Sequence, residues 1–322
     1  MVDLSIVIVN WNTRDLLRSC LKSIYAETKG PSFEIFVIDN ASQDGSAEMI
    51  EQQFPKVHLI RNTDNVGFAR ANNQAIARCK GRYILLLNPD TIVLDKALVK
   101  MVQFLDSHPT IGALGCKILR ENGKIDPRCA RHFPTLLGDL FEQTKLSAKF
   151  SKSKLFGGYL MTYWDHNSDR EVDVLSGACM MIRKEVIERV GPMDEDFFMY
   201  GDDIEWCYRI KRAGWKIFYY SKAAIIHIGD QSSKAVIARM GIEKLKSRCK
   251  FYKKHYGTLY AWAYKSLLLL ITIAKQLVFW TKLLLSDKKE EKRHQYQKKI
   301  ASNGRVLKWI LAGWPQDRGE VP

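Results

Sequence analysis

Residues 191–209 concentrate the side chains best suited to acid–base chemistry. The stretch reads GPMDEDFFMYGDDIEWCYR and holds six carboxylates against a single basic residue. Two Phe residues separate an upstream acidic cluster, Asp194 to Asp196, from the adjacent pair Asp202 and Asp203. A carboxylate held near apolar walls can have its proton affinity tuned for catalysis. The stretch is therefore either a helix start rich in acids or the place of a catalytic acid or base.

The downstream acids admit both interpretations. Asp202-Asp203-Ile204-Glu205 fits a capping box, with Asp202 at the N-cap and Glu205 three residues later. Acids are also favoured in the first turn of a helix by the macrodipole. We therefore interpret Asp202 and Glu205 as capping residues of a helix over 202–213. Asp203 is not needed for this cap, and it is the candidate general base.

The elements that must position these acids begin with alternating strands and helices. Residues 4–9, LSIVIV, are rich in β-branched side chains and predict a buried parallel strand, after which Thr13 can cap a helix. Strands alternating with helices predict βαβ units and a mostly parallel sheet. The further elements predicted in this half are strands at 33–38, 57–60 and 83–88 and helices at about 45–54 and 67–79.

Polar residues follow three of these strands. Asn10, Asp39 and Asp90 each stand where a predicted strand ends. In open α/β sheets, ligands bind outside the carboxyl ends of the strands. Asn and Asp are also common turn residues, which is the simpler explanation for any one of them. Three at three strand ends favour a ligand site.

The remainder of the first 230 residues is less regular. Residues 127–170 lose periodicity and predict a long loop with short helices. VDVLSGACMMIRK, 172–184, predicts a strand in which Gly177 marks a close approach of the backbone to another group. WKIFYY and AAIIHIGDQS predict two more strands, with His227 near the end of the last.

Composition divides the chain in two. Of the formal net charge of +15, residues 231–322 supply 14, since they hold 20 Lys and Arg against six Asp and Glu. With 322 residues and 46% apolar side chains, the chain suits a large α/β domain, 1–230, and a basic helical region, 231–322. Seven Cys without a C-x-x-C pair, and an N-terminus without a basic region or cleavage site, predict a reduced, cytoplasmic compartment.

The basic region contains an apolar helix at 259–285. Its longest uncharged run, nine residues from 266 to 274, is short against the ~20 that span a bilayer. A helix lying in an anionic membrane surface fits best, flanked by cationic segments. A buried packing helix and a spanning helix with snorkelling Lys are the alternatives, and no nucleic-acid-binding motif accompanies the basic residues. The polar residues that fall in one sector, roughly 120° wide, are Lys265, Thr272, Lys275, Gln276 and Lys282.

Seven motifs in order resemble the inverting family-2 glycosyltransferases with the GT-A fold, closest to the rhamnosyltransferase-like branch. They are SIVIVNWN, VIDNAS, N-x-G-F-A-x-A-N-N (65–73), LLNPDT, LSGACMMIRK, FFMYGDDIEWCYR and HIGDQS. The resemblance implies a mixed, mostly parallel sheet flanked by helices. It also implies transfer of a sugar, with rhamnose from dTDP-rhamnose as the best guess, from a nucleotide donor to a lipid-linked precursor of a cell-surface polysaccharide at the inner face of the membrane.

The resemblance also assigns roles to residues. Asp203 matches the second acid of the family's E-D pair, the general base, and Asp39 matches the acid that holds the nucleotide base or ribose. Asp90 matches the last acid of the D-x-D metal motif, and His227 matches a metal or diphosphate ligand, although a lone His is as often structural. A divalent cation, Mg²⁺ or Mn²⁺, is implied. The residues expected to line the nucleotide-sugar site are Asn10, Asp39, Asn65, Gly67, Asn72, Asn88 and Gly177.

Two positions depart from the family pattern. Asn88 replaces the first acid of the metal motif, and Asn72 stands where many relatives have Arg, which leaves the diphosphate one cation short. These departures give weight to a non-catalytic protein that binds a nucleotide sugar at the membrane surface. A nucleotidyltransferase is a further alternative, but VNWNTRD is not the Gly-rich basic loop that such an enzyme would need.

Overall fold

The computed structural model describes residues 2–198, 200–229, 237–286 and 290–312. The chain forms two compact units, Met1–Pro134 with Ser147–Ala235, and Thr135–Leu146 with Val236–Pro322. The boundary predicted at residues 230 and 231 lies outside the described residues. The second unit also includes Thr135–Leu146, which the sequence analysis placed in the first domain.

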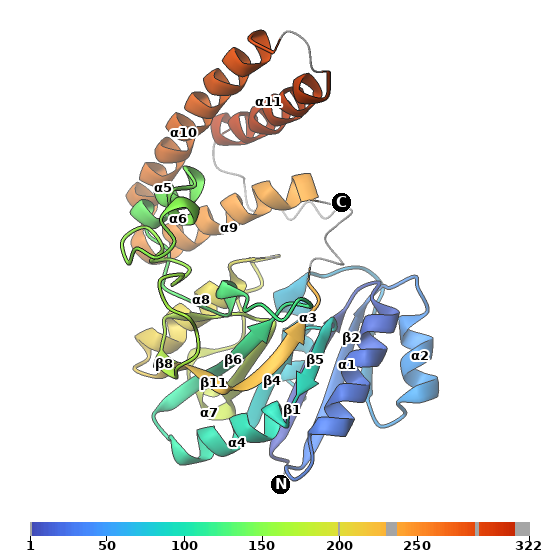
Figure 1. Ribbon diagram of the computed structural model, residues 1–322. Helices are drawn as coiled ribbons and strands as arrows, with labels where there is room; N and C mark the ends of the chain where they lie inside the picture. The colour runs from blue at the N-terminus through green and yellow to red at the C-terminus, as the bar shows by residue number, and fades with distance from the viewer. Residues whose placement is uncertain (1, 199, 230–236, 287–289, 313–322) are drawn as a thin grey trace. The chain divides into compact units, whose positions relative to one another are not determined.

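The first unit is built on a nine-stranded mixed sheet, counted over the described residues, with helices on both of its faces (Figure 1). β1, β2, β3 and β4 pair in parallel, and β6 pairs in parallel with β11, whereas β10 and β5 run antiparallel to their neighbours. The predicted α/β architecture is confirmed. In order across the sheet the strands are β3 (His58–Asn62), β2 (Phe33–Asn40), β1 (Leu4–Asn10), β4 (Tyr83–Leu87), β10 (Cys179–Arg183), β6 (Ile111–Leu119), β11 (Lys216–His227) and β5 (Thr91–Leu94), and β8 (Arg170–Glu171) pairs with β11.

Continuous apolar runs explain the central strands. All five residues of β4 are buried, as are six of the seven residues of β1, because helices cover the sheet on both sides. The parallel register of β1 and β2 places Asn10 opposite Asp39. The helices of this unit are α1 (Arg14–Glu27), α2 (Ser46–Gln53), α3 (Phe68–Ile76), α4 (Ala97–Ser107), α6 (Leu146–Lys149), α7 (Lys184–Val190) and α8 (Asp202–Arg212), with a 3₁₀ turn, η1, at Pro127–Cys129.

The irregular region between β6 and β10 forms a second, small sheet. β7 (Ala130–Arg131) pairs antiparallel with β9 (Val174–Leu175). The predicted strand over 172–184 is thus two strands, and Gly177 lies in the turn between them rather than within one. A Cβ atom at Gly177 would meet its nearest neighbour at 3.5 Å, an ordinary contact. No close approach to another protein group therefore marks Gly177 among the described residues, and the expected approach to a ligand there stays a prediction.

The last two predicted strands form one element. β11 is continuous from Lys216 to His227 because a register shift between Tyr220 and Ala224 accommodates the polar residues in its middle. Ser221 marks this shift, and both its backbone N–H and its hydroxyl donate to Asp169, at 2.8 and 2.6 Å.

The predicted caps of two helices were also wrong. α8 begins after Gly201, which is left-handed at φ +82°, and no side chain caps it from the N-cap position. Thr13 occupies the N-cap position of α1 but donates instead to Asn10, while Asp44 accepts from the N–H of Arg14 at 2.7 Å.

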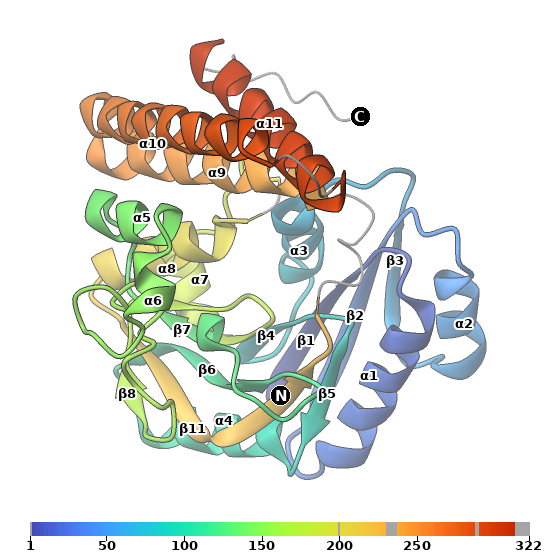
Figure 2. The ribbon, with the colours of Figure 1, turned by 45° about the horizontal axis from the view of Figure 1, so that its top comes forward.

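The second unit is helical and consists of α5 (Leu136–Gln143), α9 (Ile237–Tyr256), α10 (Thr258–Leu284) and α11 (Glu290–Leu311). α10 packs against the other three helices of the unit, and Figure 2 shows it alongside α9 and α11. The buried Asp139 carboxylate of α5 accepts from Tyr252 of α9 and pairs with Arg248. By length and composition α10 is apolar enough to cross a membrane, which keeps the spanning alternative open.

The polar stripe of α10 faces the other helices of this unit over most of its length. Lys265 is buried between the rings of Trp262 and Trp309, with Nζ 5.3 and 5.5 Å from their centroids. Thr272 is buried, and Lys275 donates to Gln143 at 3.0 Å. A helix lying in a membrane surface, the interpretation favoured from the sequence, would turn this stripe toward headgroups and water, and that is wrong for these residues. The exposed face is the apolar one, and it carries Leu259, Leu270, Ile273, Leu277, Trp280 and Leu284.

Candidate active site

Asn10 and Asp39 form a buried polar cluster at the carboxyl ends of β1 and β2. Asn10 donates from Nδ2 to Oδ1 of Asp39 at 2.9 Å and to Oγ of Ser42 at 3.0 Å. The hydroxyl of Thr13 donates to Asn10 at 2.6 Å, and the N–H of Ser42 donates to Asp39 Oδ2 at 3.0 Å. Both strand-end residues predicted here are therefore held in fixed orientations, as a preorganised binding site requires.

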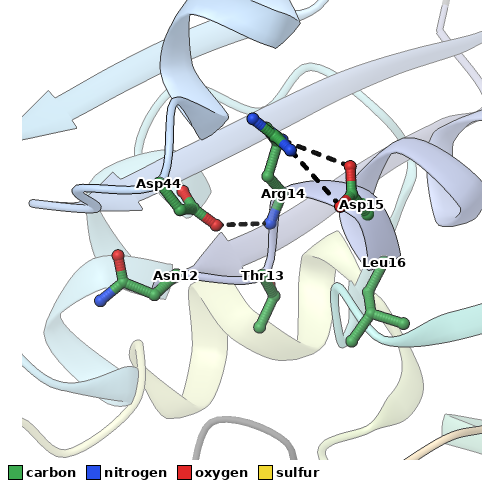
Figure 3. A pocket seen from close by; sticks show the side chains of 6 residues that line it. All are labelled: Asn12, Thr13, Arg14, Asp15, Leu16 and Asp44. Atoms are coloured by element: carbon green, nitrogen blue, oxygen red, sulfur yellow. Dashed lines mark hydrogen bonds and ion pairs between the residues drawn. The ribbon is translucent and has the colours of Figure 1, made fainter.

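A hollow of about 310 Å³ borders this cluster (Figure 3). It lies between the start of α1 and the loop after β2, and its lining includes Asn12, whose N–H donates to Ser42 at 2.9 Å. Asp44 faces the backbone of Arg14, and the guanidinium of Arg14 reaches Asp15. The hollow thus presents a cation and two carboxylates beside the strand-end cluster.

Asn65 and Gly67 shape the turn that leads into α3. Asn65 Oδ1 accepts from the N–H of Gly67 at 3.0 Å and from Nδ2 of Asn40 at 3.3 Å. Asn72 is buried one turn into the helix and donates to the carbonyl of Phe68 at 2.8 Å. Asn65 and Gly67 thus adjoin the end of β2, whereas the amide nitrogen of Asn72 binds its own helix.

Gly67 is the point where this turn meets the acidic stretch. Its φ is +86°, and a Cβ atom there would lie 2.8 Å from both the ring and the carbonyl oxygen of Phe198. The N–H of Phe68 donates to the same carbonyl at 3.1 Å. Asn73 clamps the stretch further upstream, since it donates to the carbonyl of Met193 and accepts from its N–H, at 2.9 and 3.0 Å.

Asn88, Asp90 and His227 converge after β4 and at the end of β11. Nε2 of His227 lies 3.1 Å from Oδ1 of Asp90 and 3.2 Å from Nδ2 of Asn88. The other oxygen of Asp90 accepts from the N–H of Gly229 at 3.1 Å. The structure therefore brings together the three residues that the family resemblance connected with metal and diphosphate.

This group suits a divalent cation only in part. Among the described residues, no three His, Cys, Asp or Glu side chains gather as a metal site. One carboxylate and one imidazole are nevertheless acceptable ligands, and Mg²⁺ commonly takes one or two carboxylates with the remaining oxygens from substrate phosphates and water. The side chains fit a cation that binds together with a diphosphate.

The turn between β9 and β10 connects this group with Asp203. The carbonyl of Ala178 accepts from the N–H of Asn88 at 3.1 Å. The position of a Cβ atom on the preceding Gly177 is 3.5 Å from the ring of Phe68 and 3.9 Å from Cβ of Asp203. The turn therefore binds Asn88 through Ala178, and its Gly177 faces Phe68 and the candidate base Asp203.

Asp203 is held from two sides. Its Oδ1 accepts from the N–H of Ile204 at 2.8 Å, and its Oδ2 accepts from Nη2 of Arg131 on β7. The Asp203 side chain nonetheless remains 16% exposed. Asp203 is therefore an oriented and partly accessible carboxylate, and its Oδ1 also satisfies one of the N–H groups at the start of α8.

Asp202 differs from its neighbour in every respect. It is buried, and its Oδ2 has no hydrogen-bond partner. Burial first, and then the adjacent charge of Asp203, raise the pKa of Asp202 to about 7. Glu205, the other expected capping acid, is fully buried and instead accepts from Nε of Arg209 at 2.9 Å.

A second charged group flanks the small sheet. Asp173 accepts from Lys211 and lies 2.9 Å from Nδ1 of His132. Burial acts to raise the pKa of Asp173, but the hydrogen bonds from His132 and Lys211 outweigh it and lower this pKa to about 2. Arg131 and Val174 pair with each other across the small sheet. The group holds their chain neighbours, His132 and Asp173, together.

Sequence reasoning missed Arg131, Asn40, Ser42 and Arg14. Arg131 lies in the stretch interpreted as an irregular loop, and no spacing rule connects it with an acid 72 residues away. Asn40 and Ser42 belong to the VIDNAS motif, so their proximity to Asp39 was available as a signal. Arg14 lies four residues after the end of the first strand, in a stretch that the sequence analysis considered only as a phosphate-binding loop.

Comparison with known proteins gives one family match. A family model described as "Glycosyltransferase like family 2" matches residues 3–242. An N-acetylglucosaminyl-diphospho-decaprenol L-rhamnosyltransferase of Mycobacterium tuberculosis is 26% identical over 243 residues, covering 70% of this chain and 75% of that protein. Rhamnosyltransferase WbbL of Escherichia coli (strain K12) is 26% identical over 253 residues, covering 76% of this chain and 91% of that protein.

A solved structure supports the fold. The mannosyltransferase PcManGT of Pyrobaculum calidifontis, in complex with GDP-Man and Mn²⁺, has a TM-score of 0.59 at 17% identity and covers 95% of this chain and 87% of that chain. At this identity the likeness bears on the fold alone. The predicted mostly parallel sheet flanked by helices is confirmed as the architecture of a GT-A glycosyltransferase.

Proposed function

This chain belongs to the family described as glycosyltransferase like family 2, and from that premise we propose that it is an inverting transferase for a lipid-linked precursor of a cell-surface polysaccharide. That it is a glycosyltransferase follows from the family and the relatives. Rhamnose from dTDP-rhamnose is the donor sugar we favour, because two relatives are named rhamnosyltransferases. One of those names gives a diphospho-decaprenol-linked acceptor.

The observation that carries the proposal is the setting of Asp203. This carboxylate is oriented by Arg131 and by the N–H of Ile204, yet it remains partly exposed. It faces Gly177 of the turn whose next residue, Ala178, binds Asn88 of the Asn88–Asp90–His227 group. An oriented base beside ligands for a diphosphate is what a single displacement at an anomeric carbon requires.

The proposed reaction is one in-line step. Asp203 takes the proton of an acceptor hydroxyl. At the same time the oxygen of that hydroxyl forms a bond to the anomeric carbon, from the face opposite the nucleotide. The bond from that carbon to the diphosphate oxygen breaks, and its electron pair leaves with the nucleoside diphosphate. Attack from the opposite face inverts the anomeric centre. Asp203 ends protonated and returns the proton to solvent.

The donor's nucleotide is proposed to bind at the ends of β1 and β2. Asp39 and Asn10 present fixed polar atoms there, and the hollow beside Asn12 and Arg14 adjoins them. Carboxylate oxygens accept strongly from ribose hydroxyls and base N–H groups. Asn65 and Gly67 would form the neighbouring wall of the same site.

Asp90 and His227 are proposed to hold Mg²⁺ or Mn²⁺, with Asn88 beside them. A bound cation there would neutralise the negative charge that develops on the leaving diphosphate. The N–H of Gly229 orients the Asp90 carboxylate, and the carbonyl of Ala178 holds the backbone of Asn88.

The helical unit is proposed to hold the enzyme at the inner face of the cell membrane, where an anionic lipid surface and a lipid-linked acceptor meet. Its support is the exposed apolar face of α10, which carries Leu270, Leu277 and Leu284 at 63–73% exposure. Large exposed apolar faces mark interaction sites. The cationic residues of the C-terminal region, 20 Lys and Arg from 231 onward, suit anionic headgroups.

The test of the proposed reaction combines a donor panel with one matched substitution. Purified enzyme is incubated with nucleotide sugars, a divalent cation and a polyprenyl-diphosphate-linked acceptor, and product is measured for the wild type and Asp203→Asn. The substitution should lower kcat by about 10²–10⁴-fold, the range for loss of a general base. Equal transfer by both proteins would contradict the role of Asp203. Retention of anomeric configuration in the product would contradict the single displacement.

A further inference from the structure

Two adjacent carboxyl groups at the start of α8 stand in opposite environments. Asp202 is buried with one oxygen unpartnered, whereas Asp203 accepts from Arg131 and from the N–H of Ile204. Two neighbouring carboxyls cannot both ionise easily in a poorly solvated place. Which of them holds a proton therefore decides which of them can act as a base.

Arg131 is the group that distinguishes them. Its Nη2 donates to Oδ2 of Asp203 and lies 3.5 Å from the carbonyl of Leu175, on the strand that pairs with β7. Both side chains of this ion pair are largely buried, at 13% and 16% exposure. A guanidinium at hydrogen-bond distance favours the charged form of a carboxyl group, and in a buried setting this effect is larger than at the surface.

Among the residues that the structure describes, the other groups around Asp203 do not supply this charge. On its own helix the titratable neighbours are Asp202 and the buried thiol of Cys207, whose pKa is raised to about 12, mainly by burial. Gly177 and Phe68, which approach from the β9–β10 turn and from α3, carry no charge.

Beyond Arg131 stands the Asp173 group, in which the carboxylate is already paired with Lys211 and His132. The charge of Asp173 also reaches Cys207, so it belongs to the same electrostatic neighbourhood. Its partners are fixed to it, and Arg131 remains the cation in contact with Asp203.

We propose that Arg131 is a positioning residue that fixes the ionisation of the Asp202–Asp203 pair, so that Asp202 keeps a proton and Asp203 is the carboxylate that accepts one from the acceptor hydroxyl. The inference rests on the proposed role of Asp203 as the base. It adds a residue from the irregular segment between β6 and β10 to the catalytic arrangement, acting through Asp203 rather than on the substrate.

The rigidity of β7 makes this arrangement specific. Arg131 is anchored by its backbone, since it pairs with Val174 and its carbonyl accepts from the N–H of Asp173 at 3.2 Å. The guanidinium therefore approaches Asp203 from a fixed direction, and the carboxylate presents its remaining lone pairs to one side. A Lys at this position would keep the charge but lose the planar fork that orients the carboxylate.

A spectroscopic experiment tests the protonation directly and does not depend on turnover. Infrared spectra of the full chain at pH 5 to 6, below the pKa of about 7 of Asp202, should contain a protonated-carboxyl band that Asp202→Asn removes and Asp203→Asn does not. In the Arg131→Met background, Asp202→Asn should no longer remove the band, because Asp203 has lost its cation and holds the proton instead. Persistence of the band in Asp202→Asn alone, or its loss in the double variant, would overturn the proposal.

The kinetic arm measures kcat and KM for the donor against pH. Arg131→Met should move the acidic limb of the kcat profile to higher pH, because the cation that favours the charged carboxylate is lost, and leave the donor KM unchanged. Arg131→Lys, which keeps the charge, should move the acidic limb by less than Arg131→Met does. Arg128→Met, which removes a guanidinium three residues earlier that binds Asp126, is the matched control and should leave the limb in place.

The outcomes separate this inference from the proposed function. A raised donor KM with an unmoved acidic limb would mean that Arg131 binds the diphosphate, which overturns the positioning role. Full transfer by Asp203→Asn would overturn the proposed base while the infrared comparison still reports the protonation of the pair. Circular dichroism of each variant establishes that it is folded, and Arg131→Gln provides a second neutral variant should Arg131→Met unfold.

Discussion

Nε2 of His227, at the end of β11, lies 3.1 Å from Oδ1 of Asp90, which follows β4. These strands are not neighbours in the sheet, since β10 and β6 separate them. The contact arises because Asp90 stands at the beginning of β5, which pairs antiparallel with β11 and places Thr91 opposite His227. The short strand after the N-x-D motif therefore positions the imidazole.

This relationship makes the dependence on a divalent cation predictable. Asn88→Asp would add a second carboxylate to the group, and affinity for hard cations rises with the number of charged ligands. The cation concentration that gives half-maximal activity should fall by about tenfold, whereas His227→Ala should raise it. Titration of activity with Mg²⁺ and Mn²⁺ measures both changes.

Asp95→Asn is the control for a change in charge outside the Asn88–Asp90–His227 group. Asp95 is exposed at the end of β5 and pairs with Lys100, so its loss should leave the cation dependence as it was. Activity that persists in EDTA would contradict the cation site itself. If neither Asn88→Asp nor His227→Ala changes the titration curve, the assignment of the cation site to these residues is contradicted.

Gly67 should tolerate no side chain. Its φ is +86°, and a Cβ atom would lie 2.8 Å from the backbone carbonyl of Phe198, which cannot move independently of the acidic stretch. Gly67→Ala should lower the free energy of unfolding by about 2 kcal/mol, a typical cost of such strain. Urea denaturation followed by circular dichroism gives the value.

Gly177→Ala is the matched control, because a Cβ atom there makes only ordinary contacts, at 3.5 Å and beyond. Its free energy of unfolding should stay within about 0.5 kcal/mol of the wild type. Equal losses for the two variants would show that the contact with Phe198 is not what makes Gly67 necessary.

Asp202 should make stability depend on pH. Burial and the charge of Asp203 raise its pKa to about 7 in the folded state, above the ordinary value of 3.8 for an Asp carboxyl. The folded state therefore binds this proton more tightly, so its contribution to stability is full below about pH 4 and is lost as pH rises toward 7. Asp202→Asn, which cannot ionise, should remove this decline.

The measurement is the free energy of unfolding at pH 5 and pH 8 for the wild type and Asp202→Asn. The wild type should lose at most about 1.4 kcal/mol per pH unit through this group, and the variant should be the more stable protein at pH 8. Glu185→Gln, an exposed acid in the first turn of α7, serves as the control. Parallel pH dependences of the wild type and Asp202→Asn would contradict the assignment.

Local signals in the sequence predicted the features of the fold that depend on residues close together in the chain. The strand ends at Asn10 and Asp39 were recognisable because an apolar run stops where polar residues begin, and parallel pairing then places the two residues side by side. The helix at 202–212 was recognisable from its spacing. The N-cap residue of this helix was not recognisable. The choice between Asp202 and Gly201 depends on the path of the chain near Phe198, and contacts with Gly67 and with Asn73 of α3 set that path.

Contacts between distant segments account for the rest. Arg131 meets Asp203 only because the two-residue strand β7 pairs with β9, 43 residues later, and nothing local marks β7. The direction of the polar stripe on α10 was likewise misjudged. Periodicity places Lys265 and Thr272 on one face, but only packing against the other helices of the unit shows that this face is covered.

The exposed face of α10 gives the last prediction, which concerns attachment to membranes. Replacing Leu270, Leu277 and Leu284 together by Gln should weaken binding to vesicles that contain anionic phosphatidylglycerol by at least about tenfold. Each loss removes apolar surface that lipid would cover, at about 25 cal/mol per Å². Flotation of the full chain with vesicles, at low and high salt, measures this.

Leu155→Gln, which changes a residue of the first unit that is 61% exposed, should leave vesicle binding unaltered. Binding of the triple variant equal to that of the wild type would contradict attachment through α10.

Extraction of membranes with alkaline carbonate distinguishes the two ways in which this helix can meet a bilayer. A helix lying in the surface is released because headgroup contacts and part of one face hold it, whereas a helix that crosses the bilayer stays in the membrane. Because Lys265 and Lys275 already pack within the helical unit, crossing would require α10 to leave those partners, and we expect release.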